Sequence, residues 1–249
     1  MTRIVGSGPS ETPGVSNVGP PLVALPRSFF ERDVLDVATG LLGSVLRRRD
    51  SRGVVALRIT EVEAYGGGDD PGSHAFRGPT PGNRTMFGPP GHLYCYFTYG
   101  LHYAVNVVVG ETGHAAACLV RAGAIVEGEL RARQRRTAKA RTTDLLDRSL
   151  GRGPGCVAQC FDVNLENDGD DLLSGSWEML GTTASTVGEW RCGPRVGVSG
   201  LGGHPDFSWR FWLEKEPSVS AYRAGRGTTV TRDIASPGPH GAPECKLQW

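Results

Sequence analysis

The feature of this sequence that most constrains its fold is a strand that ends in two carboxylates. Residues 54–63 alternate as β-strands do. By this alternation one face carries Leu57, Ile59, Glu61 and Glu63. Carboxylates that continue an apolar face are costly to bury unless they are paired or used in chemistry. The alternative is a strand end that emerges into water, where glutamate is ordinary. The pattern alone chooses neither between these interpretations nor between the two glutamates.

A long loop and a hairpin follow that strand. The loop, Gly66–Pro90, contains seven glycines and five prolines, and such loops in compact domains are usually functional or disordered. A hairpin is predicted from two strands, Leu93–Thr98 and His102–Val109, with Tyr99 at the tip. An aromatic side chain at a hairpin tip is either an anchor or wedge for another molecule or a group that packs back onto its own sheet.

The remaining elements are predicted from periodicity and capping signals. Capping-box spacing and helical periodicity predict a helix over residues 28–42, which Gly43 ends. The other expected strands are 44–49, 115–125, 196–198 and 209–213, and the other expected helices are 127–140 and 156–161. Residues 1–24 and 222–249 show no convincing element, so we expect two disordered segments around one folded domain, residues 25–221.

The overall charge is too balanced for a protein that coats nucleic acid. Lys and Arg number 27 against 26 Asp and Glu, a formal charge of +1, so nucleic-acid binding requires a local basic patch. Residues 121–148 supply one, with eight basic residues against four acidic ones. The alternative interpretation of this segment is an ordinary solvated helix face.

Other classes of protein are disfavoured by what the sequence lacks. It contains no run of about 18 apolar residues, which argues against a membrane span, and no signal-peptide pattern. Its six cysteines form no C-x-x-C pair, so we expect free thiols in a reducing, intracellular protein. Asp69, Asp70 and His74 give only a weak hint of a metal site, because no second histidine lies at helical spacing.

A series of short motifs resembles a known enzyme family. In order they are Glu63-Ala64-Tyr65, His74, Asn83–Tyr94, Tyr96–Gly100, Asn106, Leu119–Ala122, Gly153–Gly155, Arg195–Gly197 and Trp209–Phe211. Each motif is weak alone, but their order and spacing are similar to those of the alkyladenine DNA glycosylase family, also called 3-methyladenine DNA glycosylase. The resemblance covers about residues 25–221.

The resemblance implies a fold and a function. The fold is α+β: a single mixed domain with a curved, mainly antiparallel β-sheet, flanking helices and a protruding β-hairpin. The function is that of a monofunctional DNA glycosylase, which flips alkylated or deaminated purines out of double-stranded DNA and hydrolyses the N-glycosidic bond in base excision repair. Such an enzyme needs no metal and no organic cofactor. We expect a monomer in the cytoplasm, associated with the nucleoid if the source is prokaryotic.

Two side chains carry the chemistry that the resemblance implies. Glu63 resembles the general base that deprotonates a water attacking the sugar C1′, and only the match before Ala64-Tyr65 separates it from Glu61. Arg121 resembles the group that helps hold this water, with help from the Val196 carbonyl.

The same resemblance assigns residues that bind the base and the DNA. Tyr65, His74 and Tyr96 resemble the pocket that holds the flipped base, and Asn106 resembles the steric filter against the amino group of normal guanine. Tyr99 resembles the wedge that fills the vacated space in the duplex. The arginines expected to contact DNA are Arg84, from the motif match, and Arg133 and Arg136, from the basic segment.

Two departures and two competing interpretations remain. Gly82 and Cys156 stand where family members often carry a basic residue, which removes two possible DNA or structural contacts. A non-catalytic module that only binds damaged bases is the main alternative, although the presence of both Glu63 and Arg121 argues against it. A metal-dependent hydrolase using Asp69, Asp70 and His74 is the third interpretation.

Overall fold

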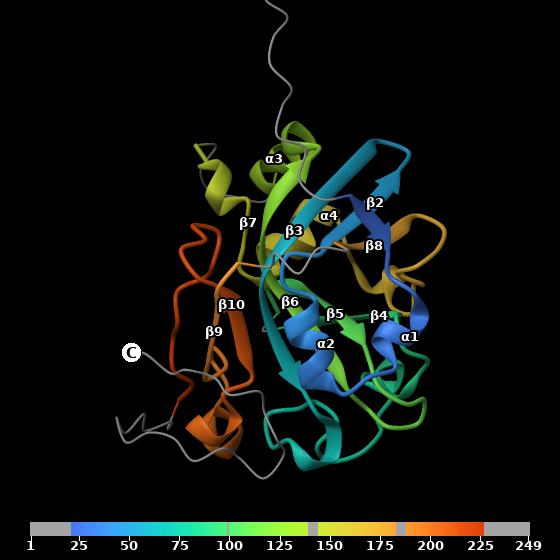
Figure 1. Cartoon of the computed structure of the whole chain (residues 1–249), viewed down its shortest axis with the longest axis vertical. Coiled ribbons are helices and arrows are strands. Elements are labelled where there is room, and N and C mark those ends of the chain that lie inside the picture. Colours follow the sequence, from blue (N-terminus) through green and yellow to red (C-terminus); the bar gives the residue numbers. More distant parts are fainter. Residues whose placement is uncertain (1–20, 99, 139–143, 183–187, 227–249) are drawn as a thin grey trace, which may run out of the picture.

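The computed structural model describes residues 21–98, 100–138, 144–182 and 188–226. Within them one sheet organises the chain (Figure 1). Its strands are β1 (Leu22–Ala24), β2 (Val45–Asp50), β3 (Gly53–Tyr65), β4 (Leu93–Thr98), β5 (His102–Val108), β6 (Ala117–Glu127), β7 (Gly151–Arg152), β8 (Trp177–Thr182), β9 (Trp190–Gly193) and β10 (Arg210–Leu213). All pairings are antiparallel, and the main path runs β1-β8-β2-β3-β6-β5-β4. The predicted α+β fold is confirmed.

In the described part of the chain, four helices and six short 3-10 turns accompany the sheet. The helices are α1 (Arg27–Phe30), α2 (Val34–Gly40), α3 (Glu129–Thr137) and α4 (Pro154–Phe161), and the turns used below are η1 (Gly67–Asp69), η2 (Arg84–Phe87) and η5 (Gly200–Gly203). α2 packs against β3 and β6, whereas α4 packs against β5 and β6. Among the described residues, no helix has the length and apolar character needed to cross a bilayer.

β3 is the strand around which the site is built. β6 pairs along one of its edges, while β2 and β10 share the other edge, with β10 opposite Glu61–Glu63. The β3–β6 ladder contains three irregularities: Val126 and Arg121 are extra residues on β6, and Thr60 is an extra residue on β3. β-bulges of this kind are common beside active sites, where they redirect side chains.

The bulge at Thr60 corrects the predicted strand face. Leu57 and Ile59 belong to the main apolar core, but the core face continues as Val62 and Ala64. One extra residue reverses the period-two alternation. Glu61 and Glu63 therefore lie on the opposite face, and neither emerges into water, because both are fully buried.

Several local predictions are wrong. The expected helix over 28–42 is split into α1 and α2, because the Asp33 side chain accepts from the Leu35 amide and caps a new helix. The expected strand 196–198 is an irregular loop, with Gly197 at φ 74°. Strands β8 and β9 were absent from the prediction altogether.

Residues just outside both predicted domain boundaries make contacts with the folded domain. Residues 22–24 lie in the segment expected to be disordered, yet they pair as β1 with β8. At the other end, the Arg223 carbonyl accepts from the Gly197 amide. Boundaries at 24/25 and 221/222 stay predictions.

The cysteines follow the prediction only in part. Cys95, Cys118, Cys156 and Cys160 are free thiols. Burial raises the pKa of Cys95 to about 12, and it also raises the pKa of Cys118, so these thiols are poor nucleophiles at neutral pH. Cys192 is disulfide-bonded, so the expectation that every thiol is free is wrong there.

Candidate active site

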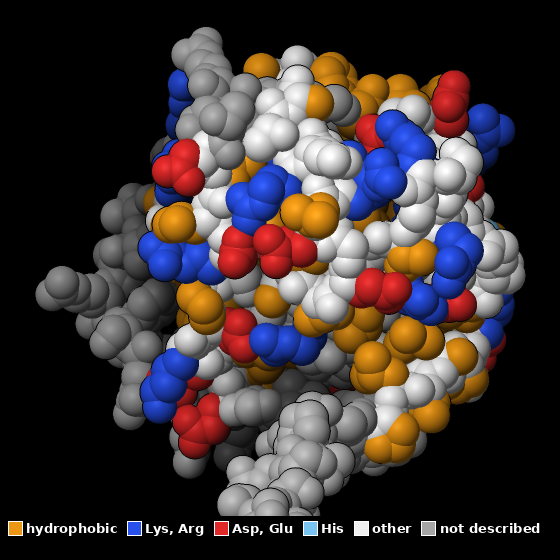
Figure 2. Space-filling view, turned by 90° about the horizontal axis from the view of Figure 1, so that it is seen from above, with side chains coloured by type: hydrophobic (Ala, Val, Ile, Leu, Met, Phe, Trp, Pro, Cys, Tyr) orange, Lys and Arg blue, Asp and Glu red, His pale blue; other side chains and the backbone are white. Residues whose placement is uncertain are grey.

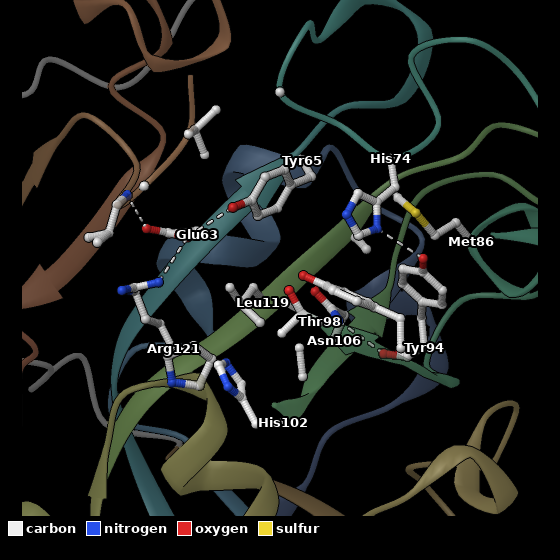
Figure 3. Close-up of a pocket in the computed structure, with 18 of the residues that line it drawn as sticks. Glu63, Tyr65, His74, Met86, Tyr94, Thr98, His102, Asn106, Leu119 and Arg121 are labelled. Atoms are coloured by element: carbon white, nitrogen blue, oxygen red, sulfur yellow. Dashed lines mark hydrogen bonds and ion pairs between the residues drawn. The ribbon is translucent and has the colours of Figure 1, made fainter. Parts of the chain in front are cut away.

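A cavity of about 330 Å³ opens beside the carboxyl-terminal half of β3. Its walls come from β3, β4, β5 and β6, from the loop that follows β3 and from the loop that follows β9 (Figure 3). Among the lining residues are all those expected to do chemistry or hold the base: Glu63, Arg121, Tyr65, His74, Tyr96, Asn106 and Val196. Residues that are up to 133 positions apart in the sequence are thus brought into one site.

Glu63 lies fully buried at one end of the cavity, where three donors surround its carboxylate. The Val196 amide donates to Oε1 at 2.7 Å, and the Tyr65 hydroxyl donates to Oε2 at 2.9 Å. Nη1 of Arg121 lies 3.5 Å from Oε2. Figure 3 shows Tyr65 and Arg121 pointing towards the Glu63 carboxylate. Because every neighbour is a donor, Glu63 is held as an acceptor, as a general base must be.

Val196 acts here through its amide. The sequence comparison implied a role for its carbonyl, but the interaction that the structure shows is the Val196 N–H bond to Glu63. The irregular loop at 196–198 makes this possible, since its backbone is not used in a sheet ladder.

Glu61 is engaged in a different way from Glu63. It does not line the cavity. Its carboxylate instead accepts from Nε of Arg210 at 2.6 Å and from the Ser220 amide at 2.7 Å. Arg121 bridges the two glutamates, because its Nε lies 3.1 Å from Glu61 Oε1 while its Nη1 faces Glu63. Geometry therefore separates two glutamates that the sequence pattern left equivalent.

The opposite side of the cavity is aromatic. The rings of His74 and Tyr96 lie 4.3 Å apart between centroids, and those of Tyr94 and Tyr96 lie 5.4 Å apart. Nδ1 of His74 is 3.1 Å from the Tyr94 hydroxyl. His74 keeps part of its surface exposed, yet burial lowers the pKa of its imidazole, so its neutral form is favoured at physiological pH.

The loop that carries His74 is ordered by internal bonds. The Asn83 side chain donates to the His74 carbonyl at 3.0 Å and accepts from the Thr80 amide at 2.6 Å. Asn83 is buried, as are Ala75 and Met86. Of the two possibilities for this long glycine- and proline-rich segment, the structure therefore supports the functional loop.

Tyr65 is supported from behind by a buried ion pair. The Arg195 guanidinium lies 4.6 Å from the Tyr65 ring centroid. Two bonds of 2.5 and 2.6 Å join it to the Asp70 carboxylate, and neither side chain has any exposed surface. Burial opposes the charged form of Arg195, but Asp70 outweighs it and raises the pKa of Arg195. Burial and the charge of Glu63 raise the pKa of Tyr65, so its hydroxyl stays a donor.

Asn106 is held in one orientation on the cavity wall. Its Nδ2 donates to the Tyr94 carbonyl at 3.0 Å, and the residue is buried. An amide fixed in this way cannot turn aside for a bulky substituent without losing a buried hydrogen bond.

The residues expected to contact DNA lie outside the cavity. Arg84 is exposed on η2. On α3, Arg133 pairs with Glu129 and Asp147, and Arg136 bonds to Gln159. Figure 2 views the end of the molecule where α3 lies and shows basic side chains next to acidic ones. Arg133 is thus paired with acidic neighbours, whereas the partner of Arg136 is an uncharged amide. Tyr99 falls outside the described residues.

Sequence reasoning missed several cavity residues. They are Met86, Tyr94, Thr98, His102, Pro154 and Ser199. Tyr94 and Thr98 were accessible to it, because alternation along β4 places them on the same face as Tyr96. His102 lies at the start of β5, and burial followed by the charge of Arg121 lowers its pKa.

The weak hint of a metal site is not supported by the arrangement of its residues. Asp70 is committed to Arg195 on both carboxylate oxygens, whereas His74 bonds to Tyr94. Across the described ranges, no cluster of three or more His, Cys, Asp or Glu side chains is placed to hold an ion.

Comparison with known proteins identifies the family. The family model described as methylpurine-DNA glycosylase matches residues 28–217. This chain belongs to that family. The resemblance found in the sequence motifs is confirmed, and the matched range contains every cavity residue.

Bacterial members of the family are close in sequence. A protein of Streptomyces avermitilis is 49% identical over 209 residues, which are 82% of this chain and 94% of the relative. A protein of Leifsonia xyli is 50% identical over 198 residues, 79% of this chain and 92% of the relative. A third, from Cutibacterium acnes, is 42% identical over 195 residues, 76% of this chain and 95% of the relative. All three carry the provisional name 3-methyladenine DNA glycosylase.

Proposed function

We propose that this protein is a monofunctional DNA glycosylase of base excision repair that releases alkylated or deaminated purines from double-stranded DNA. Family membership supports N-glycosidic hydrolysis as the reaction. The observation that carries the proposal is Glu63: a fully buried carboxylate, surrounded by donors, at one end of a cavity with aromatic walls. Because cavities of about 300–1,000 Å³ suit small ligands, a single base fits the space better than a stretch of duplex.

In the reaction, Glu63 takes a proton from a water held beside it and beside Arg121. The water oxygen forms a bond to the sugar C1′, and the C1′–N bond breaks with its electron pair going to the purine. Positive charge develops on the sugar, and the carboxylate next to it stabilises that charge. A purine alkylated at N3 or N7 leaves as a neutral base, whereas a neutral lesion such as hypoxanthine needs a proton from elsewhere.

The aromatic walls select for a flat ring rather than for one base. Stacking on an aromatic side chain contributes about 1–3 kcal/mol per base and tolerates different bases. This gain is comparable to the few kcal/mol needed to unstack and flip a nucleotide, a cost that is smallest for a damaged or badly paired base. Asn106, fixed by its bond to Tyr94, is proposed as the filter that rejects the amino group of normal guanine.

A single hydrolytic step is favoured over lyase chemistry by the cavity lining. A glycosylase with lyase activity needs an amine nucleophile, and none of the described residues that line the cavity is a lysine.

We further propose that the protein acts as a monomer on duplex DNA in the cytoplasm, with Tyr99 as the wedge and Arg84, Arg133 and Arg136 as contacts to DNA. The paired state of Arg133 means that its DNA contact would have to replace an ion pair.

The proposal is tested with duplexes that carry one damaged purine. Protein is incubated with labelled DNA containing hypoxanthine, 3-methyladenine or 7-methylguanine, and the product is cleaved with hot alkali. We expect more strand breaks at one or more of these lesions than in the same lesion duplex incubated without protein, and none in the matched undamaged duplex. Binding to lesion DNA without breaks on any substrate would establish the non-catalytic module instead. Loss of activity on addition of a chelator would support the metal-dependent hydrolase.

A further inference from the structure

The segment that follows β10 runs beside β3 and reaches Glu61, next to the carboxylate end of the cavity. We call residues 216–223 the strap. Its contacts alternate along β3: Glu216 pairs with Arg58 at 2.6 Å, and the Ser218 hydroxyl lies 2.9 Å from that of Thr60. Ser220 then reaches Glu61. The strap therefore follows the face of β3 that carries the two glutamates.

Ser220 is the strap residue that touches the reaction machinery. Its hydroxyl accepts a hydrogen bond from Nε of Arg121 at 3.1 Å and donates to Glu61 Oε1 at 3.0 Å. Its backbone is fixed as well, since the amide donates to Glu61 at 2.7 Å and the carbonyl accepts from Arg210 Nη2 at 2.8 Å. The backbone amide and carbonyl of Ser220 are thus both bonded, and they hold its hydroxyl next to Arg121.

This contact fixes the direction in which Arg121 points. A guanidinium has five N–H donors in one rigid plane. The Nε side of Arg121 faces Ser220 and Glu61, and Nη1 faces Glu63 at 3.5 Å. Because the plane is rigid, anchoring Nε sets where the other donors lie. Without the Ser220 hydroxyl, Nε of Arg121 loses one of these two contacts, and the guanidinium is held less firmly in this direction.

We propose that Ser220, acting with Glu61, is a positioning residue for base excision that holds Arg121 in place for the reaction. This inference rests on the proposed function, in which Arg121 helps hold the attacking water. Ser220 lies beyond residue 217, where the match to the family model ends, so the family comparison alone does not point to it.

The test compares two serines of the strap. Ser220→Ala removes the hydroxyl that contacts Arg121 but keeps the backbone bonds to Glu61 and Arg210. Ser218→Ala is the matched control, since it removes a buried strap hydroxyl whose partner is Thr60. The measurements are the single-turnover rate of base release from a hypoxanthine duplex, the affinity for the same duplex, and the melting temperature.

We expect Ser220→Ala to lower the single-turnover rate about tenfold or more, as for loss of a hydrogen bond to a charged group. Its lesion affinity should change less than about threefold. Ser218→Ala should keep the rate within about twofold, even if it melts at a lower temperature. Ser220→Thr, which retains the hydroxyl, should recover most of the rate. Equal rates for Ser220→Ala and Ser218→Ala would overturn the proposal.

A double-mutant cycle separates positioning from a general structural effect. If Ser220 acts through Arg121, adding Ser220→Ala to Arg121→Gln produces no further loss, whereas independent effects multiply. The same cycle distinguishes the two levels of the argument. An Arg121→Gln variant with the normal rate would remove Arg121 from the proposed mechanism. A slow Arg121→Gln variant beside a normal Ser220→Ala variant would overturn only the role of Ser220.

Discussion

The two ends of the cavity are built by opposite principles. At the carboxylate end (Glu63, Arg121 and the Val196 amide), Glu63 is fully buried, the Arg121 side chain is 11% exposed, and both are held by several partners. At the aromatic end (His74, Tyr94 and Tyr96), neutral rings pack edge to face or tilted, and His74 stays partly exposed. Figure 3 shows the two ends facing each other across the cavity.

This difference determines which substitutions each end of the cavity can tolerate. A buried carboxylate depends on particular donors at particular positions, so the loss of one partner leaves a desolvated charge without compensation. A stacking surface depends on area and flatness, so substitutions there have graded effects. The carboxylate end should therefore respond to mutation in an all-or-none way, and the aromatic end should respond by degrees.

The largest expected effect is on the chemical step. Glu63→Gln keeps the shape of the side chain but cannot accept a proton from water. Since general base catalysis contributes about 10²–10⁴-fold, we expect the single-turnover rate of base release to fall by that factor, with lesion affinity retained. Glu111→Gln, a change at an exposed glutamate, is the matched control. Retained base release in Glu63→Gln would remove Glu63 from its role as the base.

The next effect is on stability, behind the Tyr65 ring. Asp70→Asn leaves the Arg195 guanidinium buried without its counter-charge. Breaking a buried pair by removing one partner costs about 3–5 kcal/mol, which urea unfolding would detect. Asp147→Asn, at a surface pair with Arg133, should change the free energy of unfolding little. If both variants unfold at the same urea concentration, the Asp70–Arg195 pair contributes no more to the free energy of unfolding than the surface pair does.

A smaller effect is expected at the aromatic end. Tyr96→Ala removes a stacking surface worth about 1–3 kcal/mol per base, so lesion affinity should weaken about fivefold to 150-fold. Tyr96→Phe retains the ring and should bind nearly as well as the wild type. Binding is measured by titration of labelled lesion duplex in the Glu63→Gln background, which prevents turnover. A similar loss for both variants would show that the hydroxyl, rather than the ring, holds the base.

The smallest effect concerns pH. Burial lowers the pKa of His74 below its ordinary 6.5, so the imidazole is neutral at pH 7.5 and gains a proton only as the pH falls below about 6.5. A charge at this position repels a cationic base such as 7-methylguanine. From pH 7.5 to 5.5 we expect affinity for 7-methylguanine to fall up to about fivefold more than affinity for hypoxanthine. His74→Gln should abolish this difference, and a difference that persists in that variant would assign the titration to another group.

The sequence predicts an element well when the residues that specify it lie close together in the chain. The β4–β5 hairpin was predictable because its alternation and its turn lie within a few residues of each other. β8 and β9 were not predicted, because their sequences, WEMLGT and WRCG, alternate over only about three residues and are stabilised by pairing with distant strands.

The site was predictable from the motifs but not from the residues alone. Alternation misplaced Glu61 and Glu63, because the bulge at Thr60 depends on pairing with β6. The Asp70–Arg195 pair and the contact of Ser220 with Arg121 join segments that no local pattern connects. The assignment of roles to Glu63 and Arg121 came from family likeness, and the geometry then supplied a physical reason for it.

The separation along the chain between bonded partners also has a consequence for how the site comes into being. Bonds at the aromatic end span short separations: 20 residues between His74 and Tyr94, and 12 between Asn106 and Tyr94. At the carboxylate end they span 133 residues from Glu63 to Val196 and 159 from Glu61 to Ser220. Short loops close at lower entropic cost. During synthesis the aromatic end can therefore assemble before Val196 and Ser220, which complete the carboxylate end, have left the ribosome. With the roles proposed for the two ends, a nascent chain acquires the means to recognise damage before it acquires the means to excise it.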